Sequence, residues 1–174
     1  MGLCLNKCLR SYTKIRSDRY FVRKVPGVSD QRSLAGIAAR ALANTGQPVI
    51  LPEFDGKEAI VLYSDRKPIA FALYKDKEHT PRILTDVYVD LGFQHQGFGT
   101  YLIFLTLTNC NMLEVNVPFK NTPMVSLITK LKFQIASQDS DSVRAAISGI
   151  SQRSFVLICV PAWIINEFSL KTFS

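Results

Sequence analysis

The seven residues from Gln94 to Thr100, QHQGFGT, have the types and spacing to bind a phosphate group. Two of them, Gly97 and Gly99, carry no side chain that would keep a ligand away from the backbone. The loop lies between an apolar pattern typical of a strand and an apolar pattern typical of a helix. Such a junction directs backbone N–H groups and the positive end of a helix dipole at one point. Because such points bind phosphate or pyrophosphate, the sequence predicts a phosphate-bearing ligand.

The spacing excludes two common classes of phosphate-binding glycine loop. A nucleotide triphosphatase loop needs a lysine between its last glycine and a Ser or Thr, and Gly99 is followed directly by Thr100. A dinucleotide-binding loop needs a third glycine three residues after the second, where this chain has Leu102. A third pattern, Gln or Arg, two residues, Gly, one residue, then Gly or Ala, fits Gln94 to Gly99.

Hydrophobic periodicity and turn residues predict the elements that position this loop. Strands are expected over residues 20–25, 58–63, 68–74, 82–89, 112–117, 133–136 and 155–160. Helices are expected from Ser29 or Asp30 to about Gly46, over 100–108, from Asn121 to about Lys132, and as a short helix around 143–147. The order predicts a mixed α/β (α+β) fold, in which a single, mostly antiparallel sheet is covered by helices on both faces.

Length and composition indicate one folded domain. The chain has 174 residues with 47% hydrophobic and 10% aromatic content, which is enough for a core and argues against disorder. We expect a basic arm at residues 1–19 and a single domain at 20–174. The N-terminus lacks a secretory signal and the cysteines lack metal-site spacing, so we expect a cytoplasmic protein with free thiols, no membrane span and no metal. The four cysteines are Cys4, Cys8, Cys110 and Cys159.

The positive charge is concentrated at the N-terminus. Residues 1–25 contain seven Lys or Arg residues and one Asp, and so hold +6 of the net charge of +7. The basic residues between positions 7 and 24, interleaved with Tyr12, Tyr20 and Phe21, have the character of a nucleic-acid contact. A solvated basic arm is the favoured alternative, because no nucleic-acid-binding motif accompanies them.

The loop pattern and its surroundings resemble the GNAT superfamily of acyl-CoA-dependent N-acetyltransferases. The resemblance spans roughly Tyr20 to Val160. It includes the order of elements and a downstream spacing kept by Asn121, Leu127, Leu131 and Phe133. The chain departs from the family where Ile128 replaces a common tyrosine and Lys132 replaces a glycine. It also lacks the usual proline after Asp90.

The resemblance implies acetyl-CoA as co-substrate. The strand before the loop would pair through its backbone with the pantetheine arm, and the loop amides would surround the pyrophosphate. The implied cofactor-binding residues are Val87, Tyr88, Val89, Gln94, His95, Gln96, Gly97, Phe98, Gly99, Thr100 and Asn121. Capping a helix is an alternative role for Asn121, and both roles remain open.

The implied chemistry is attack of a neutral amine on the acetyl thioester, which needs a base, donors to the thioester oxygen and a proton for the thiolate. Asp86 is the candidate base, and its alternative is a surface ion pair with a lysine. Glu114, Glu53 and Asp55 are weaker candidates. Tyr74 and Tyr88 are either core or site residues, His95 is interpreted as a loop residue, and His79 is expected to be exposed.

The leading interpretation is therefore an N-acetyltransferase acting on a primary amine of a protein, small molecule or nucleic acid. The alternative is a catalytically weak acyl-CoA-binding or nucleic-acid-associated regulatory module, for which Ile128 is the main reason. No acidic cluster favours a polycationic acceptor, and the basic arm makes tRNA or DNA more attractive. The sequence leaves the acceptor and the oligomeric state, a homodimer included, undetermined.

Overall fold

The computed structural model describes most of the chain between Tyr20 and Ser148. The described residues are 20–26, 30–43, 49–76, 81–108, 110 and 112–148. The expected basic arm at 1–19, His79, three of the four cysteines and the expected strand at 155–160 lie outside these ranges. Among the described helices, none is long and apolar enough to cross a membrane.

One sheet of seven strands, in the order β1-β2-β3-β4-β5-β7-β6, organises the described residues. Neighbouring strands are antiparallel except for β4 and β5, which are parallel. The strands are β1 (Tyr20–Pro26), β2 (Glu58–Ser64), β3 (Lys67–Lys75), β4 (Arg82–Val89), β5 (Met112–Pro118), β6 (Gln134–Gln138) and β7 (Ser142–Ser148). The helices are α2 (Gln31–Ala43), the one-turn η2 (Leu91–Phe93), α3 (Phe98–Leu107) and α4 (Thr122–Lys130). The mixed, mostly antiparallel sheet expected from the sequence is confirmed.

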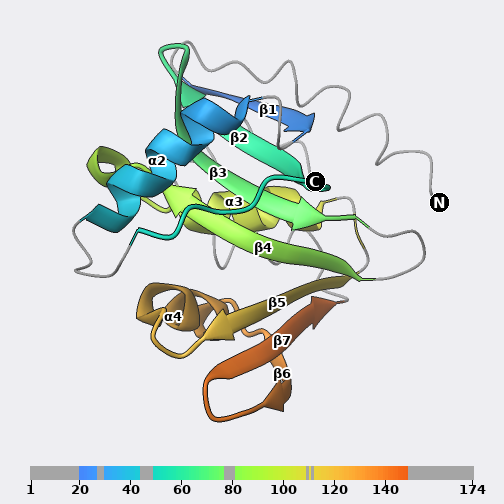
Figure 1. Cartoon of the computed structure of the whole chain (residues 1–174). Coiled ribbons are helices and arrows are strands. Elements are labelled where there is room, and N and C mark those ends of the chain that lie inside the picture. The colour runs from blue at the N-terminus through green and yellow to red at the C-terminus, as the bar shows by residue number, and fades with distance from the viewer. Residues whose placement is uncertain are drawn as a thin grey trace, which may run out of the picture.

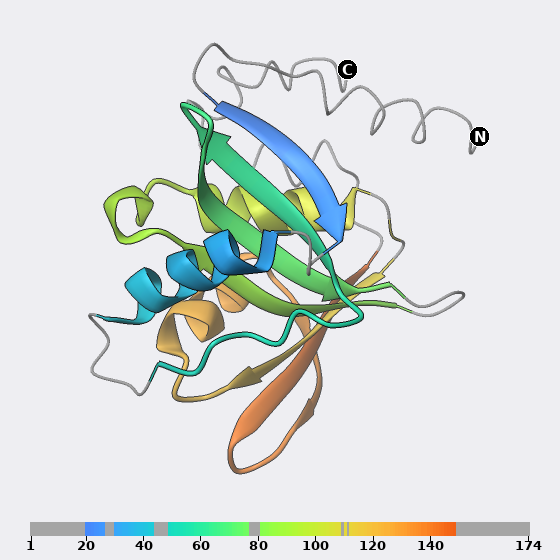
Figure 2. The same cartoon turned by 45° about the horizontal axis from the view of Figure 1, so that its top comes forward.

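The helices cover both faces of the sheet because its central strands are apolar on both sides (Figure 1). Along β2, Ala59 and Val61 pack with α2, whereas the alternate residues Ile60 and Leu62 pack with α3. Figure 2 shows α2 and α3 on opposite faces of β2 and β3. Alternating burial on two faces is typical of strands between two helical layers, and it fixes α3 against the centre of the sheet.

The hairpin between β2 and β3 follows the local sequence. Asp65 and Arg66 have φ values of 49° and 66°, which is the geometry of the two-residue turn that matches strand twist. The expected turn at 64–67 is confirmed. The start of α4 is confirmed as well, since Asn121 precedes the helix and Pro123 occupies its first turn.

The prediction of a short helix around 143–147 is wrong, because these residues belong to the strand β7. Val143, Ala145 and Ile147 alternate inward and join the core. β7 pairs with β5 and β6 on its two edges. Pairing on both edges and burial of one face outweigh a weak local helix propensity.

Strands β4 and β5 run side by side only at their beginnings. Their register covers three pairs, from Arg82 opposite Leu113 to Leu84 opposite Val115. Beyond these pairs the two strands diverge (Figure 1). The second half of β4, residues 85–89, is therefore paired with β3 alone among the described strands.

Candidate functional site

The loop before α3 presents backbone N–H groups that no described carbonyl accepts. Gly97 is the residue at the start of the helix, with φ of 89° and no capping side chain. The first helical bond runs from the Tyr101 N–H to the Gly97 carbonyl at 3.0 Å. Within the described part of the chain, the amides of His95, Gly97, Gly99 and Thr100 have no backbone acceptor. Four N–H groups and the positive end of the helix dipole therefore meet in one turn.

Side-chain amides hold this loop in place. The Gln94 Nε2 donates to the Val89 carbonyl at 3.1 Å, and the Gln96 Nε2 donates to the Gly92 carbonyl at 3.3 Å. The Phe93 and Phe98 rings lie 6.2 Å apart, on the two sides of the loop. The expected site residues Gln94 and Gln96 thus brace the loop with their side chains, and the expected phosphate-binding groups are the backbone amides between them.

Gly97 and Gly99 have different reasons to be glycine. Gly97 has a positive φ, a backbone conformation that glycine adopts without strain. A Cβ on Gly99 would meet the Leu127 Cδ2 at 3.7 Å and the Val89 Cγ2 at 4.0 Å, which are ordinary contacts. The fold itself therefore has room for a side chain at position 99.

The second half of β4 provides a free backbone edge beside this loop. The Asp90 N–H donates to the Ile69 carbonyl of β3 at 2.8 Å. Consecutive residues of a strand direct their backbone groups to alternate edges, so those of Val89 and Val87 point away from β3. The Val89 carbonyl accepts from Gln94, and no described strand pairs with the other groups of this edge. The structure therefore brings together the expected residues of β4 and of the loop, because η2 connects them directly.

Asn121 acts as a helix cap in this structure. Its side-chain oxygen accepts a hydrogen bond from the Met124 N–H at 3.3 Å. This satisfies one of the N–H groups that the first turn of α4 leaves open. The alternative role that the sequence offered for Asn121 is the observed one.

Asp86 is in an ion pair with a lysine that is almost buried. The Lys57 Nζ lies 3.2 Å from the Asp86 Oδ2, and the two side chains are 7% and 18% exposed. Lys57 ends the loop before β2, 29 residues from Asp86 in sequence. The carboxylate therefore has a fixed position on β4, with one oxygen held by an ammonium group that is largely shielded from water.

The remaining carboxylate and histidine candidates are less well placed. Glu114 of β5 forms an ion pair with Arg144 at 2.7 Å, and Glu53 and Asp55 are exposed. His95 is exposed in the loop with φ of 61°. Ile128 is 4% exposed and packs in the core. The described residues contain no group of three or more His, Cys, Asp or Glu side chains that could hold a metal ion.

Sequence reasoning missed two basic residues that contact the acids of this region. Lys57 pairs with Asp86, and Arg40 of α2 pairs with Asp90, with 2.6 Å between Nη2 and Oδ2. Arg40 and Asp90 are 50 residues apart in sequence. No local pattern signals such pairs, because each depends on how α2 and its following loop cross the sheet.

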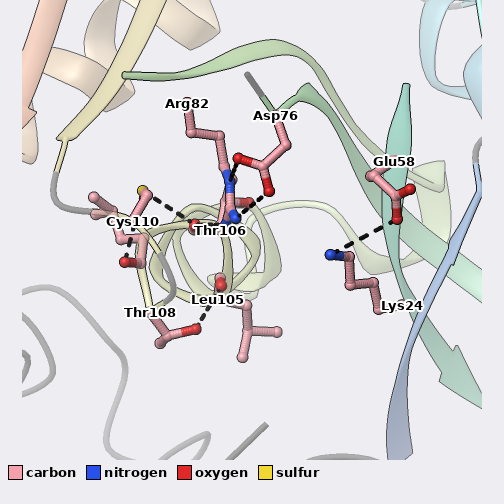
Figure 3. A network of polar contacts seen from close by, with 9 residues as sticks. Lys24, Glu58, Asp76, Arg82, Leu105, Thr106, Thr108 and Cys110 are labelled. Atoms are coloured by element: carbon pink, nitrogen blue, oxygen red, sulfur yellow. Dashed lines mark hydrogen bonds and ion pairs between the residues drawn. The ribbon is translucent and has the colours of Figure 1, made fainter. Parts of the chain in front are cut away.

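The opposite end of α3 is closed by polar contacts (Figure 3). The Arg82 Nη1 donates to the Thr106 carbonyl at 2.7 Å, and its Nη2 lies 2.7 Å from Asp76. The guanidinium also lies 4.5 Å from the centre of the Tyr74 ring. The Thr108 hydroxyl donates to the Leu105 carbonyl, and the Cys110 thiol donates to the Thr106 and Leu107 carbonyls. A cation and several donors thus satisfy the negative end of the helix.

Burial controls the ionisation of two groups at this closed end. Burial raises the pKa of the Tyr74 phenol well above its usual value of 10, and the nearby Arg82 opposes part of that rise. Burial also raises the pKa of the Cys110 thiol. Both groups therefore stay protonated at neutral pH.

Comparisons with known proteins identify the fold. No protein-family profile matches the chain. A curated phenylalanine–tRNA ligase beta subunit from Aromatoleum aromaticum is 29% identical over 133 residues, which are 69% of this chain and 16% of that protein. The chain thus spans only a small part of that relative's length.

Solved acetyltransferases share the architecture over nearly their whole length. The ribosomal-protein-S18-alanine N-acetyltransferase from Escherichia coli has a TM-score of 0.59 at 18% identity, covering 76% of this chain and 96% of that one. PaiA N-acetyltransferase from Thermoplasma acidophilum, solved in complex with coenzyme A, has a TM-score of 0.59 at 14% identity, covering 75% and 99%. A GNAT-family acetyltransferase from Bacillus cereus has a TM-score of 0.56 at 13% identity, covering 76% and 99%. The resemblance stated from the sequence is confirmed at the level of the fold.

Proposed function

We propose that this chain, which has the fold of the GNAT acetyltransferases, binds acetyl-CoA and transfers its acetyl group to a primary amine. The observation that carries the proposal is the direct junction of two binding features within 16 residues, from Asp86 to Tyr101. The edge of β4 that no described strand pairs with, and the amides at the start of α3 that have no described backbone acceptor, follow one another along the chain. One accepts an extended amide-containing arm and the other an anion, and acyl-CoA contains both.

Each cofactor residue has a defined part in this proposal. The amides from His95 to Thr100 would bind the pyrophosphate, and the backbone of residues 87–89 would pair with the pantetheine arm. Gln94 would act indirectly, by fixing the Val89 carbonyl. Asn121 would act through the start of α4, which it caps.

The proposed chemistry requires removal of a proton from the acceptor amine. Asp86 is the proposed base, because it is the acidic residue within the free half of β4 and its carboxylate has a fixed position. Only one of its oxygens is held by Lys57, so the second can accept a proton. The Lys57 ammonium would keep the carboxylate oriented while the acceptor enters.

The acceptor is proposed only as a primary amine. Among the described residues, the acids near the free edge are already paired with bases, as Asp86, Asp90 and Glu114 show. Such a surface has no spare carboxylates for a polyamine. The basic residues between positions 7 and 24 keep nucleic acid among the proposed acceptors or partners, and a cytoplasmic location and a domain at residues 20–174 are likewise proposed.

The test separates binding from transfer. Calorimetric titration with coenzyme A measures binding, and mass spectrometry after incubation with isotope-labelled acetyl-CoA measures transfer to amino acids, amino sugars, polyamines, peptides and tRNA. We expect micromolar binding and one acetyl group added to at least one acceptor. Binding without any transfer would favour the regulatory module, and the absence of binding would overturn both interpretations.

A matched pair of variants tests the base. Asp86→Asn should reduce the transfer rate about 100-fold, as expected for loss of a general base, with unchanged affinity for coenzyme A. The control is Glu114→Gln, since Glu114 is equally exposed and also paired with a basic side chain. Equal rates for the two variants would remove Asp86 from the mechanism.

A further inference from the structure

Transfer of an acetyl group from a thioester leaves a thiolate that must gain a proton. Ile128, at the start of the last turn of α4, is apolar and buried, so it supplies none. A side-chain donor among the described residues would therefore have to lie elsewhere near the free half of β4. Asp86 and Asp90 in this region are already held by Lys57 and Arg40.

Tyr88 is the residue of this segment that carries an ionisable O–H. It lies between Val87 and Val89, whose backbones form the free edge, and opposite Phe71 in the register with β3. The Tyr88 and Phe71 rings are 5.4 Å apart at 36°, so packing fixes the direction of the phenol. Tyr88 is only partly buried.

The Tyr88 hydroxyl has no hydrogen-bond partner among the described residues, whereas the Tyr63 hydroxyl on the same face of the sheet donates to the Asp30 Oδ2 at 3.1 Å. Tyr88 therefore combines a ring held by packing with a hydroxyl that is available to a ligand. A hydroxyl with no partner in the described part of the chain, on a partly open strand face, is what a proton donor to a substrate requires.

We propose that Tyr88 is a catalytic residue that donates its hydroxyl proton to the departing thiolate, an inference that rests on the proposed function. The new N–C bond forms as the C–S bond breaks, and the electron pair of that bond stays on sulfur, which takes the proton of Tyr88. The proton lost by the amine goes to Asp86, two residues away on the same face of β4, and from there restores the phenol. The balance is amine plus acetyl thioester to amide plus free thiol.

The electrostatics of Tyr88 agree with this role. Burial, and secondarily the negative charge of Asp86, raise the pKa of the Tyr88 phenol. The hydroxyl therefore keeps its proton at neutral pH and is still able to donate it when the thiolate forms, with protonated Asp86 restoring the phenol afterwards. The charged groups on the elements around it are Asp86 and Asp90 on or just after β4, Lys57 in the loop and Arg40 on α2.

The first part of the test removes the hydroxyl and keeps the ring. In Tyr88→Phe we expect kcat for acetyl transfer from acetyl-CoA to fall roughly 10- to 100-fold, at the low end for a general acid because thiolates leave readily. Affinity for coenzyme A and the thermal unfolding midpoint should stay at their wild-type values. The control Tyr63→Phe removes a phenol on the same face of the sheet and should keep the wild-type kcat.

The second part changes the acidity of the phenol without removing it. A fluorinated tyrosine at position 88 should retain activity at neutral pH, and the upper limit of its pH–rate profile should move to lower pH as fluorine atoms are added. A structural role would leave that limit in place. The role of Tyr88 would be overturned if Tyr88→Phe had the wild-type kcat, or if the upper limit of the pH–rate profile did not change on fluorination. Acetyl transfer by the wild-type protein would still support the proposed function in that case. Wild-type protein that transfers nothing would overturn both.

Discussion

The two ends of α3 differ in how their backbone groups are satisfied. At the C-terminal end, Arg82, Thr108 and Cys110 supply donors to the last carbonyls. At the N-terminal end, Gly97 is the N-cap residue and has no side chain that could accept a hydrogen bond. The amides of Gly99 and Thr100 have no described backbone acceptor. The same helix is therefore complete at one end and incomplete at the other.

This difference shows where the fold uses its polar groups for stability and where it leaves them for a ligand. A buried helix such as α3 cannot rely on water at both ends. Closing the C-terminal end with a buried arginine anchors the helix to the first residue of β4. The N-terminal end is thereby held at a fixed distance from the other end of that strand, ready to receive an anion.

The largest expected effect is at the closed end. Arg82→Met should lower the free energy of unfolding by about 2–4 kcal/mol, because it leaves the Thr106 carbonyl with only the weak Cys110 thiol as a side-chain donor and removes the buried cation that pairs with Asp76. Chemical denaturation measures the change. The control Arg144→Met removes an exposed pair with Glu114 and should cost less than about 1 kcal/mol. Similar losses of unfolding free energy in both variants would show that Arg82 stabilises the fold no more than an exposed ion pair does.

At the N-terminal end of α3, an added methyl group should stabilise the fold, in contrast to the loss expected for Arg82→Met at the C-terminal end. Gly99→Ala should raise the free energy of unfolding by about 0.5–1 kcal/mol, because alanine favours the helix and the site has room. It should also weaken binding of coenzyme A at least tenfold, or about 1.4 kcal/mol, because the methyl group lies where the pyrophosphate would approach.

Gly36→Ala is the matched control for that substitution. Gly36 lies inside α2, and an added Cβ would meet only the flexible end of Arg40 at 3.4 Å. We expect a similar gain in stability and an unchanged affinity for coenzyme A. A Gly99→Ala protein that binds as tightly as wild type would place the ligand elsewhere.

Alkaline pH should weaken the closed end. The Tyr74 pKa is raised in the folded protein, so the phenol stays neutral while the unfolded chain ionises above pH 10. The associated stability is present below pH 10 and is lost as the pH rises from there through the folded-state pKa, by up to about 1.4 kcal/mol per unit. Denaturation at pH 9 and pH 11 should show a shallower decline for Tyr74→Phe, and an unchanged decline would contradict this cause.

The C-terminal end of α4, outside the two ends of α3, is closed with a strained residue. Lys132 has φ of 57°, and the Lys132 and Phe133 N–H groups donate to the Thr129 and Ile128 carbonyls. Glycine is preferred at this position of the motif, so Lys132→Gly should stabilise the fold by about 1 kcal/mol. Lys130→Gly, at the last residue of the helix itself, should instead destabilise it. Stability changes of the same sign in the two variants would contradict backbone strain at Lys132.

Local patterns in the sequence were sufficient to predict most elements and the loop. The bounds of β4 match the alternation from Arg82 to Val89, and the turn at Asp65 and the cap at Asn121 follow from the preferences of those residues. The β6–β7 hairpin also had a signal that the prediction missed. The Asp139 side chain accepts from the Asp141 and Ser142 N–H groups, and such aspartates mark turns.

Contacts between distant segments were not predictable in the same way. The pairing of Lys57 with Asp86 depends on the course of a long loop, and the pairing of Arg82 with the Thr106 carbonyl depends on the length of α3. The unusual property of Tyr88, a packed ring with a free hydroxyl, depends on Phe71 in the neighbouring strand. Periodicity places each residue on an element, but only the assembled sheet places it beside its partner.

The most direct test of an open N-terminal end on α3 is a titration of ¹⁵N-labelled protein with coenzyme A, followed through backbone amide chemical shifts. Saturable shifts should be largest at His95, Gly97, Gly99 and Thr100 and absent at Thr108 and Cys110. Pantetheine, which lacks the pyrophosphate, should shift residues 87–89 and leave the loop amides unchanged. Loop amides that do not move at saturating coenzyme A, or equal shifts at both ends of the helix, would contradict the account.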